Sequence, residues 1–225
     1  MKATTLVSET DRQAIEKRIG EIEQTTTAEL VVAVATESGR YDRAESIIGI
    51  ITALVALGIA HLFPSLFRSA GDWAETNLNI LFQSLAVVVG FVIGNYLAVF
   101  FLPLRRLFVG KEEQARETDK AASYIFCNHK LNETEARNGV LIYLSVFERR
   151  IVILADQSCK NGLGMEKIQE ICNSTIAELK AGKYRDAILL ALDQLATQLT
   201  ESLPANRQLD ENELSDRVLV FHRSV

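Results

Sequence analysis

Two long segments of the chain contain no Asp, Glu, Lys or Arg, although charged segments flank both of them. They cover residues 46–67 and 76–104. The hydrocarbon core of a bilayer is about 30 Å thick, and a helix rising 1.5 Å per residue needs about 20 apolar residues to cross it. Because both segments reach that length, the pattern predicts a hairpin of two transmembrane helices, at about 46–66 and 80–102.

Small residues recur at a spacing of four within both predicted helices. Gly90 and Gly94 form such a pair in the second helix, and the first helix contains the pairs Gly49/Ala53 and Ala56/Ala60. Small residues at this spacing let two helix backbones approach closely. Packing within the hairpin is the favoured interpretation, and a homodimer through Gly90 and Gly94 is the alternative.

The basic residues next to the hairpin predict its orientation. Cytoplasmic flanks of membrane helices carry an excess of Lys and Arg, and an even number of spans returns the chain to its starting side. Only Arg68 lies between the two predicted helices, whereas Arg40, Arg43, Arg105, Arg106, Lys111 and Arg116 flank them. The first residues form no apolar signal segment. We therefore expect a multi-pass protein of the cell (inner) membrane with both termini in the cytoplasm.

Outside the hairpin, apolar residues recur either at helical spacing or in short β-branched runs. Apolar positions three or four residues apart predict helices, and continuous β-branched runs predict strands buried on both faces. On this basis we expect helices at about 8–24, 112–128, 165–179 and 187–199, and strands at 29–36, 140–146 and 150–155. The last two strands lie close in sequence and predict an antiparallel pair.

This order predicts an α/β fold, with a small mixed β-sheet flanked by helices on both faces. The transmembrane hairpin is inserted between strand one and the following helix. The expected organisation is an N-terminal half-domain at 1–43, the hairpin at 44–106, a C-terminal half-domain at 107–204 and a polar tail at 205–225. The tail contains one short apolar patch, at 218–221, for which docking on the domain and solvent exposure are equally expected.

Charge and cysteine content exclude several classes of function. The net charge of −5 and the pI of about 5.4 give no general attraction for nucleic acid, and basic residues do not cluster with aromatic ones. The three cysteines are Cys127, Cys159 and Cys172, and they match no zinc-binding spacing. We expect free thiols in a reducing compartment, and partners other than nucleic acid: the lipid bilayer and other membrane proteins.

Polar side chains are expected to meet at one edge of the predicted sheet. If the first two strands are parallel, their starts share an edge, and the third strand ends there. Glu29, Arg137, Asn138 and Asp156 would then converge, and carboxylate and amide oxygens suit Ca²⁺ or Mg²⁺. In the alternative, Arg137 pairs with one acid, Asn138 caps the turn and Gly139 is a turn residue.

The sequence also contains candidate catalytic residues. None of the three histidines lies near a candidate nucleophile in sequence, so no triad is recognisable. Metal-assisted phosphate hydrolysis by Asp156 and Glu29, which are also the candidate metal ligands, stays open as a hypothesis. Arg137, Asn138 and Gly139 are the candidate binding rim.

Four segments resemble the TPM domain, a family named after a thylakoid-lumen protein, a photosystem II repair protein and a modulator of a neurotransmitter receptor. The segments RNGVLIYLS (137–145) and ERRIVILAD (148–156) resemble its core signature. TAELVV (27–32) resembles the first strand of the family. NELSD (212–216) is similar to an acidic motif of bacterial members, and the chain as a whole resembles their membrane-protein branch.

The resemblance implies two functions. In the first, the domain is a binding, assembly or quality-control module for other membrane proteins. In the second, it is a metal-dependent hydrolase like an acid phosphatase, because a plant member is an acid phosphatase and calcium binding is described in the family. Ca²⁺ or Mg²⁺ is then the implied cofactor.

Overall fold

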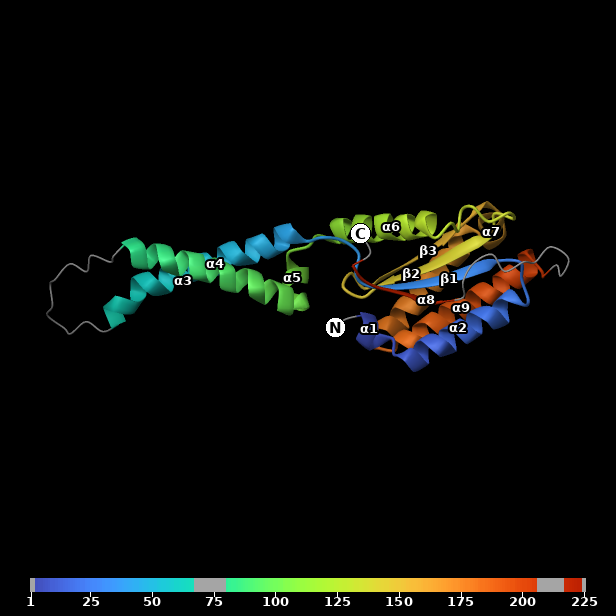
Figure 1. Cartoon of the computed structure of the whole chain (residues 1–225), viewed down its shortest axis with the longest axis horizontal. Coiled ribbons are helices and arrows are strands. Elements are labelled where there is room, and N and C mark those ends of the chain that lie inside the picture. Colours follow the sequence, from blue (N-terminus) through green and yellow to red (C-terminus); the bar gives the residue numbers. More distant parts are fainter. Residues whose placement is uncertain (1–2, 67–79, 206–216, 224–225) are drawn as a thin grey trace. The chain divides into compact units, whose positions relative to one another are not determined.

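The computed structural model describes residues 3–66, 80–205 and 217–223. The chain forms two compact units, Met1–Gly39 with Glu112–Val225, and Arg40–Lys111 (Figure 1). The first unit is thus made of two segments that are separated in sequence by the second unit.

The first unit is built on a four-stranded sheet with the strand order β3-β2-β1-β4. Strand β1 pairs in parallel with β2 on one side and with β4 on the other, and β2 pairs antiparallel with β3. The sheet is therefore mixed, as predicted. The strands are β1 (Glu29–Glu37), β2 (Gly139–Ser145), β3 (Arg150–Ala155) and β4 (Leu219–Arg223).

Helices cover both faces of the sheet (Figure 1). One face carries α6 (Lys111–Asn128). The helices that share a core with the other face are α1 (Ala3–Leu6), α2 (Glu9–Glu23), α7 (Gln157–Leu163), α8 (Met165–Lys180) and α9 (Tyr184–Ser202). The α/β fold with helices on both faces is confirmed.

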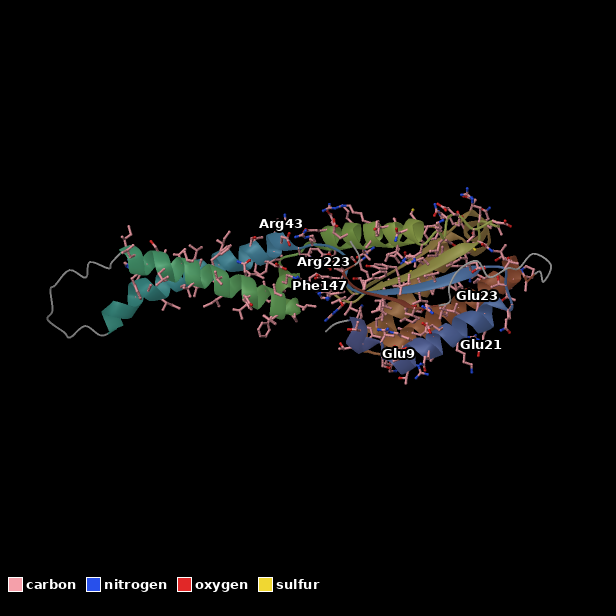
Figure 2. All side chains as sticks on the ribbon, viewed as in Figure 1. Glu9, Glu21, Glu23, Arg43, Phe147 and Arg223 are labelled. Carbon is pink, nitrogen blue, oxygen red and sulfur yellow. The ribbon has the colours of Figure 1, made fainter. Side chains whose placement is uncertain are left out.

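Successive side chains of strand β1 point to opposite sides of the sheet, and helices cover both sides, so both faces of the strand are buried. Leu30 and Val32 belong to the core shared with α2, α8 and α9, whereas Val31 and Ala33 belong to the core shared with α6. This arrangement explains why the strand is a continuous apolar run. On α2, Glu9 and Glu21 project from the outer side of the helix (Figure 2).

The beginning of α2 follows the local sequence signal. The Ser8 hydroxyl accepts a hydrogen bond from the Asp11 amide at 3.2 Å, and an Asp11 carboxylate oxygen accepts one from the Ser8 amide at 3.1 Å. This reciprocal capping box satisfies two amides that have no partner within the helix. The hydrogen bonds from Ser8 hold the pKa of the Asp11 carboxyl below its ordinary value.

The C-terminal segment contributes an element that periodicity did not predict. The apolar patch at 218–221 docks, since Leu219–Arg223 forms β4 beside β1. The Arg223 guanidinium donates to the Glu37 carboxylate at 2.6 Å and fixes the end of this strand pair. The NELSD segment lies outside the described residues.

The second unit contains α3 (Asp42–Leu66), α4 (Ile80–Phe100) and α5 (Leu102–Leu107). Residues 42–62 and 80–100 are long and apolar enough to cross a membrane. The two long helices pack against each other, and the Thr52 hydroxyl donates across the pair to the Gly90 carbonyl at 2.8 Å. The two helices therefore form a hairpin between β1 and α6, at the place in the chain where the sequence predicts one, and their crossing of a membrane stays a prediction.

Glycines allow this close packing. A methyl group added to Gly90 would lie 2.7 Å from the Ala56 side chain and 2.9 Å from the Thr52 carbonyl oxygen. One added to Gly94 would meet the Gly49 backbone at 2.8 Å. Both glycines thus face the partner helix of the hairpin, while the homodimer stays a prediction.

A partly buried ion pair links Arg105 after α4 to Glu45 near the start of α3. The Arg105 guanidinium donates to the Glu45 carboxylate at 2.8 Å, and its carbon lies 5.9 Å from the centre of the Tyr41 ring. An arginine with little exposure to water is stabilised by such a partner and by an aromatic face.

Candidate functional site

The starts of β1 and β2 and the end of β3 meet at one edge of the sheet. Glu29 is opposite Gly139 in the parallel pair, and its amide donates to the Asn138 carbonyl at 3.2 Å. The Asp156 amide donates to the Gly139 carbonyl at 2.9 Å. The backbones of the predicted site residues therefore converge on this edge, which we call the acidic rim: Glu29, Arg137, Asn138, Gly139 and Asp156.

Asp156 uses one carboxylate oxygen structurally. Its Oδ1 accepts from the Gln157 amide at 2.8 Å and caps α7. Its Oδ2 is buried and receives no hydrogen bond from the described residues. One oxygen of this carboxylate is thus occupied, and the other still lacks a donor.

Asn138 is held by its backbone and by its side-chain nitrogen. Its amide donates to the Thr134 hydroxyl at 3.1 Å, and its Nδ2 donates to the Thr27 carbonyl. Its Oδ1 is buried without a donor among the described residues. The Cys159 thiol donates to the Asn138 carbonyl at 3.1 Å.

Glu29 and Asp156 are on opposite sides of β2. The Glu29 residue is 5% exposed. Since β2 lies between their strands, their backbones are two strand spacings apart, roughly 9–10 Å. Within residues 3–66, 80–205 and 217–223, no three His, Cys, Asp or Glu side chains are grouped so that they could hold a metal ion. A cation at the rim would therefore also need amide or carbonyl oxygens.

Arg137 and Gly139 have roles that differ from a simple turn. Arg137 adopts a left-handed backbone with a φ of 53°, and its carbonyl accepts from the Ser158 amide at 3.1 Å. Its side chain is exposed. Gly139 is the first residue of β2, and a methyl group there would overlap the Leu131 carbonyl oxygen. Glycine is needed because the loop after α6 crosses the strand.

Sequence reasoning omitted two neighbours of the rim. Asn132, on the loop that crosses Gly139, has a buried Oδ1 with no donor from the described residues. Cys159 is buried, and burial together with the nearby Asp156 charge raises the pKa of its thiol to about 12. A loop rich in Asn, Thr and acids at 132–138 was the available signal for Asn132.

Comparisons with known proteins agree with this fold. The model of the TPM domain matches residues 98–198, a range that runs from the end of α4 to α9 and includes β2, β3 and the Asp156 end of the rim. The NMR structure of the BA42 protein from the psychrophilic bacterium Bizionia argentinensis is similar over 95% of this chain and 94% of that one, with a TM-score of 0.55 and 15% identity. No curated protein matches the chain. The match covers both core signature segments and confirms the resemblance to the TPM domain over residues 98–198.

Proposed function

We propose that the TPM domain is a cytoplasmic binding and assembly or quality-control module for other membrane proteins, tethered to the cell (inner) membrane by the α3–α4 hairpin. The observation that supports this proposal is where the hairpin enters the domain. It interrupts the chain between β1 and α6, yet β1 still pairs with β2 along residues Glu29–Ala35. The domain keeps a complete sheet and core, so the insertion adds a membrane attachment without removing any part of the fold.

Two exposed apolar side chains offer contact points for a protein partner. Tyr124 on α6 is 55% exposed, and Met165 at the start of α8 is 76% exposed. Because α6 and α8 cover opposite faces of the sheet, each residue samples a different surface of the domain. Aromatic residues and methionine are enriched at protein interfaces.

Site-specific crosslinking in intact membranes tests this proposal. A photoreactive amino acid replaces Tyr124 or Met165 in the full chain, and Lys17, whose side chain is 80% exposed on α2, is the control position. We expect discrete crosslinks to membrane proteins from one of the first two positions and none from Lys17. Equal products from all three positions, or no products, would contradict the proposal.

A metal-dependent hydrolase of the acid-phosphatase type is the second candidate, and the rim supports it with one observation. Asp156 Oδ2, Asn138 Oδ1 and Asn132 Oδ1 are all buried acceptors without a donor from the described residues. Buried polar atoms are normally satisfied, and hard oxygen atoms are the ligands that Ca²⁺ and Mg²⁺ prefer. With Glu29, these atoms would hold the ion, which would polarise a phosphate ester.

Two substitutions test the hydrolase. Asp156→Asn and Glu29→Gln should each abolish hydrolysis of a generic phosphomonoester and remove the stabilisation of the protein by Ca²⁺ in a thermal melt. Glu133→Gln is the matched control, because Glu133 is an exposed acid in the loop 132–138 that follows α6. This variant should keep both the hydrolysis and the stabilisation by Ca²⁺. Hydrolysis that survives both rim substitutions excludes the rim as the active site.

A further inference from the structure

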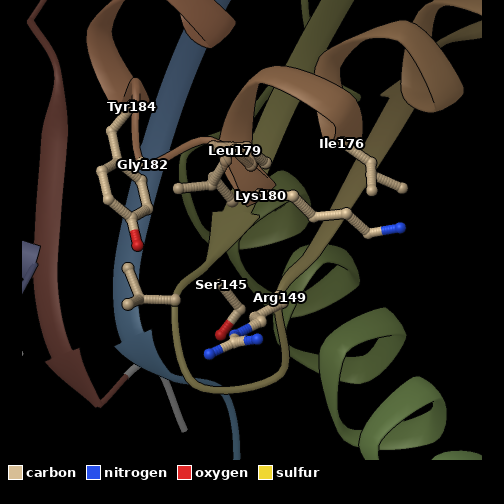
Figure 3. Close-up of a pocket in the computed structure, with 9 residues that line it drawn as sticks. Ser145, Arg149, Ile176, Leu179, Lys180, Gly182 and Tyr184 are labelled. Carbon is tan, nitrogen blue, oxygen red and sulfur yellow. The ribbon is translucent and has the colours of Figure 1, made fainter.

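A polar cavity lies at the end of β2 that is opposite the acidic rim. It has a volume of about 130 Å³ and is lined by the end of β2, by the β2–β3 turn and by the residues that connect α8 to α9 (Figure 3). Its polar lining consists of Ser145, Arg149, Lys180 and Tyr184. Six residues of strand separate Ser145 from Gly139, or roughly 20 Å. This cavity, which we call the basic pocket, is therefore separate from the acidic rim.

The two cations of the basic pocket have no acidic partner in the described parts of the chain. The nearby acids pair with other basic residues: Asp119 contacts Arg150 at 3.3 Å, and Glu178 contacts Lys183 at 3.5 Å. The nearest acid in sequence, Glu148, accepts hydrogen bonds from the Ser38 amide at 2.9 Å and from the Ser145 hydroxyl. The positive charges of Arg149 and Lys180 thus remain available to a ligand.

The backbone fixes the walls of the basic pocket. Arg149 has a φ of 53°, a left-handed conformation that is uncommon for a side chain other than glycine. Gly182, between α8 and α9, has a φ of 79°, and a methyl group added there would meet no other atom within 4 Å. Non-glycine residues in such conformations concentrate at functional sites. The backbone at Arg149 is therefore unusual, and it places an exposed arginine side chain beside the cavity.

The size and the lining select the class of ligand. A volume of about 130 Å³ holds about four waters, since a water occupies about 30 Å³ in the liquid. That space suits one phosphate group. A guanidinium binds phosphate oxygens through two parallel hydrogen bonds, and the Tyr184 hydroxyl is a further donor. The exposed Lys180 amine points away from Arg149 in Figure 3, and it would add a donor by rotating toward the ligand. Leu144 and Leu179 line the same cavity and suit an apolar group next to the phosphate.

We propose that the basic pocket binds a phosphate group, carried either by a lipid headgroup or by a soluble compound. This proposal is independent of the assembly function and of the rim, because it uses neither the exposed Tyr124 and Met165 nor the acidic residues. It adds a small-molecule binding site to the domain.

The test uses the full chain in nanodiscs of phosphatidylcholine, titrated with inorganic phosphate by calorimetry. A second arm measures retention of phosphatidic acid by native mass spectrometry. Arg149→Asn is the main variant, because asparagine tolerates a positive φ. Lys180→Gln is the second variant. Lys183→Gln removes the same charge three residues away, at a position that does not line the pocket, and is the matched control.

A hydrogen bond to a charged group contributes enough that each pocket variant should weaken binding about tenfold or more. The Lys183→Gln protein should bind within about twofold of the original, since its lysine is exposed and outside the pocket. Binding of phosphatidic acid alone assigns the phosphate to a lipid, and binding of inorganic phosphate assigns it to a soluble source. No binding in either arm, or an equal loss in Lys183→Gln, would overturn the proposal.

Discussion

At the scale of single residues, glycine is required at position 139 because the backbone of Leu131, eight residues earlier in the chain, lies against it. A methyl group there would overlap the Leu131 carbonyl oxygen, which belongs to the backbone and cannot rotate away. We predict that Gly139→Ala destabilises the domain by about 2–3 kcal/mol, the cost of forcing extra volume into a packed site. Chemical denaturation monitored by circular dichroism measures this change.

The matched control for this substitution is Gly110→Ala. Gly110 has no atoms within 4 Å of an added methyl group, so the same chemical change should leave the free energy of unfolding nearly unchanged. Equal stability of the two variants would show that the loop after α6 does not press on β2.

The three thiols should differ in reactivity for reasons of burial. Cys127 is exposed, whereas Cys159 and Cys172 are buried and burial raises the pKa of both thiols. The thiolate is the reactive form, so at pH 8 a disulfide reagent should modify Cys127 quickly and the other two only after unfolding. Absorbance of the released thiol gives the count, and Cys127→Ser should remove the fast phase.

The raised pKa of the Cys159 thiol also predicts how the stability of the protein changes with pH. Its folded value of about 12 exceeds the ordinary value of 9.0, so the protonated thiol favours the folded state. This contribution is complete below pH 9 and is lost as the pH rises toward 12. The difference in free energy of unfolding between the original protein and Cys159→Ala should therefore shrink as the pH rises from 9 toward 12. A constant difference would contradict the assignment.

The sequence predicted that the backbones of the rim residues meet at one edge of the sheet, whereas their role as a binding site stays a prediction. Parallel pairing of the first two strands was enough to bring Glu29, Asn138 and Asp156 to one edge. The role of Gly139 and the buried oxygen of Asn132 depend on the path of the loop after α6. The path of a loop cannot be predicted from the spacing of apolar residues, because a loop has no repeating pattern.

At the scale of elements, the fit between α3 and α4 depends on which side of a helix a glycine occupies. Gly90 faces α3, whereas Gly58 has open space around an added methyl group. We predict that Gly90→Leu separates the two helices and lowers the melting temperature of the protein in detergent, since its side chain has no room. Gly58→Leu makes the same change and should melt like the original. Similar melting of both variants would contradict packing within the hairpin.

Elements with strong local signals were predicted well, and an element that depends on a distant partner was not. The helices α2, α6, α8 and α9 follow their apolar spacing, and strands β1, β2 and β3 follow their β-branched runs. Strand β4 has five residues, none of them fully buried. It forms because the free edge of β1 is available to it, and the local pattern gave no sign of that edge.

At the scale of the whole molecule, two spans constrain where the ends of the chain lie. If α3 and α4 both cross the bilayer, the two segments of the α/β unit must be on the same side, because β1 and β2 come from opposite sides of the hairpin and pair directly. A single crossing, or a crossing by one segment only, would separate β1 from β2. The β1–β2 pair therefore requires that the chain cross the bilayer an even number of times between these strands.

We predict that reporters fused before Met1 and after Val225 are both active in the cytoplasm, and that a reporter inserted within 67–79 is active on the other side. Paired cytoplasmic and external reporters in intact cells measure this topology, and the protein should stay with the membrane after alkaline extraction. The basic flanks Arg40, Arg43 and Arg106 give the direction, since positive residues stay inside. Terminal reporters on different sides are incompatible with the β1–β2 pair. Both termini outside would keep the fold and reverse only the orientation.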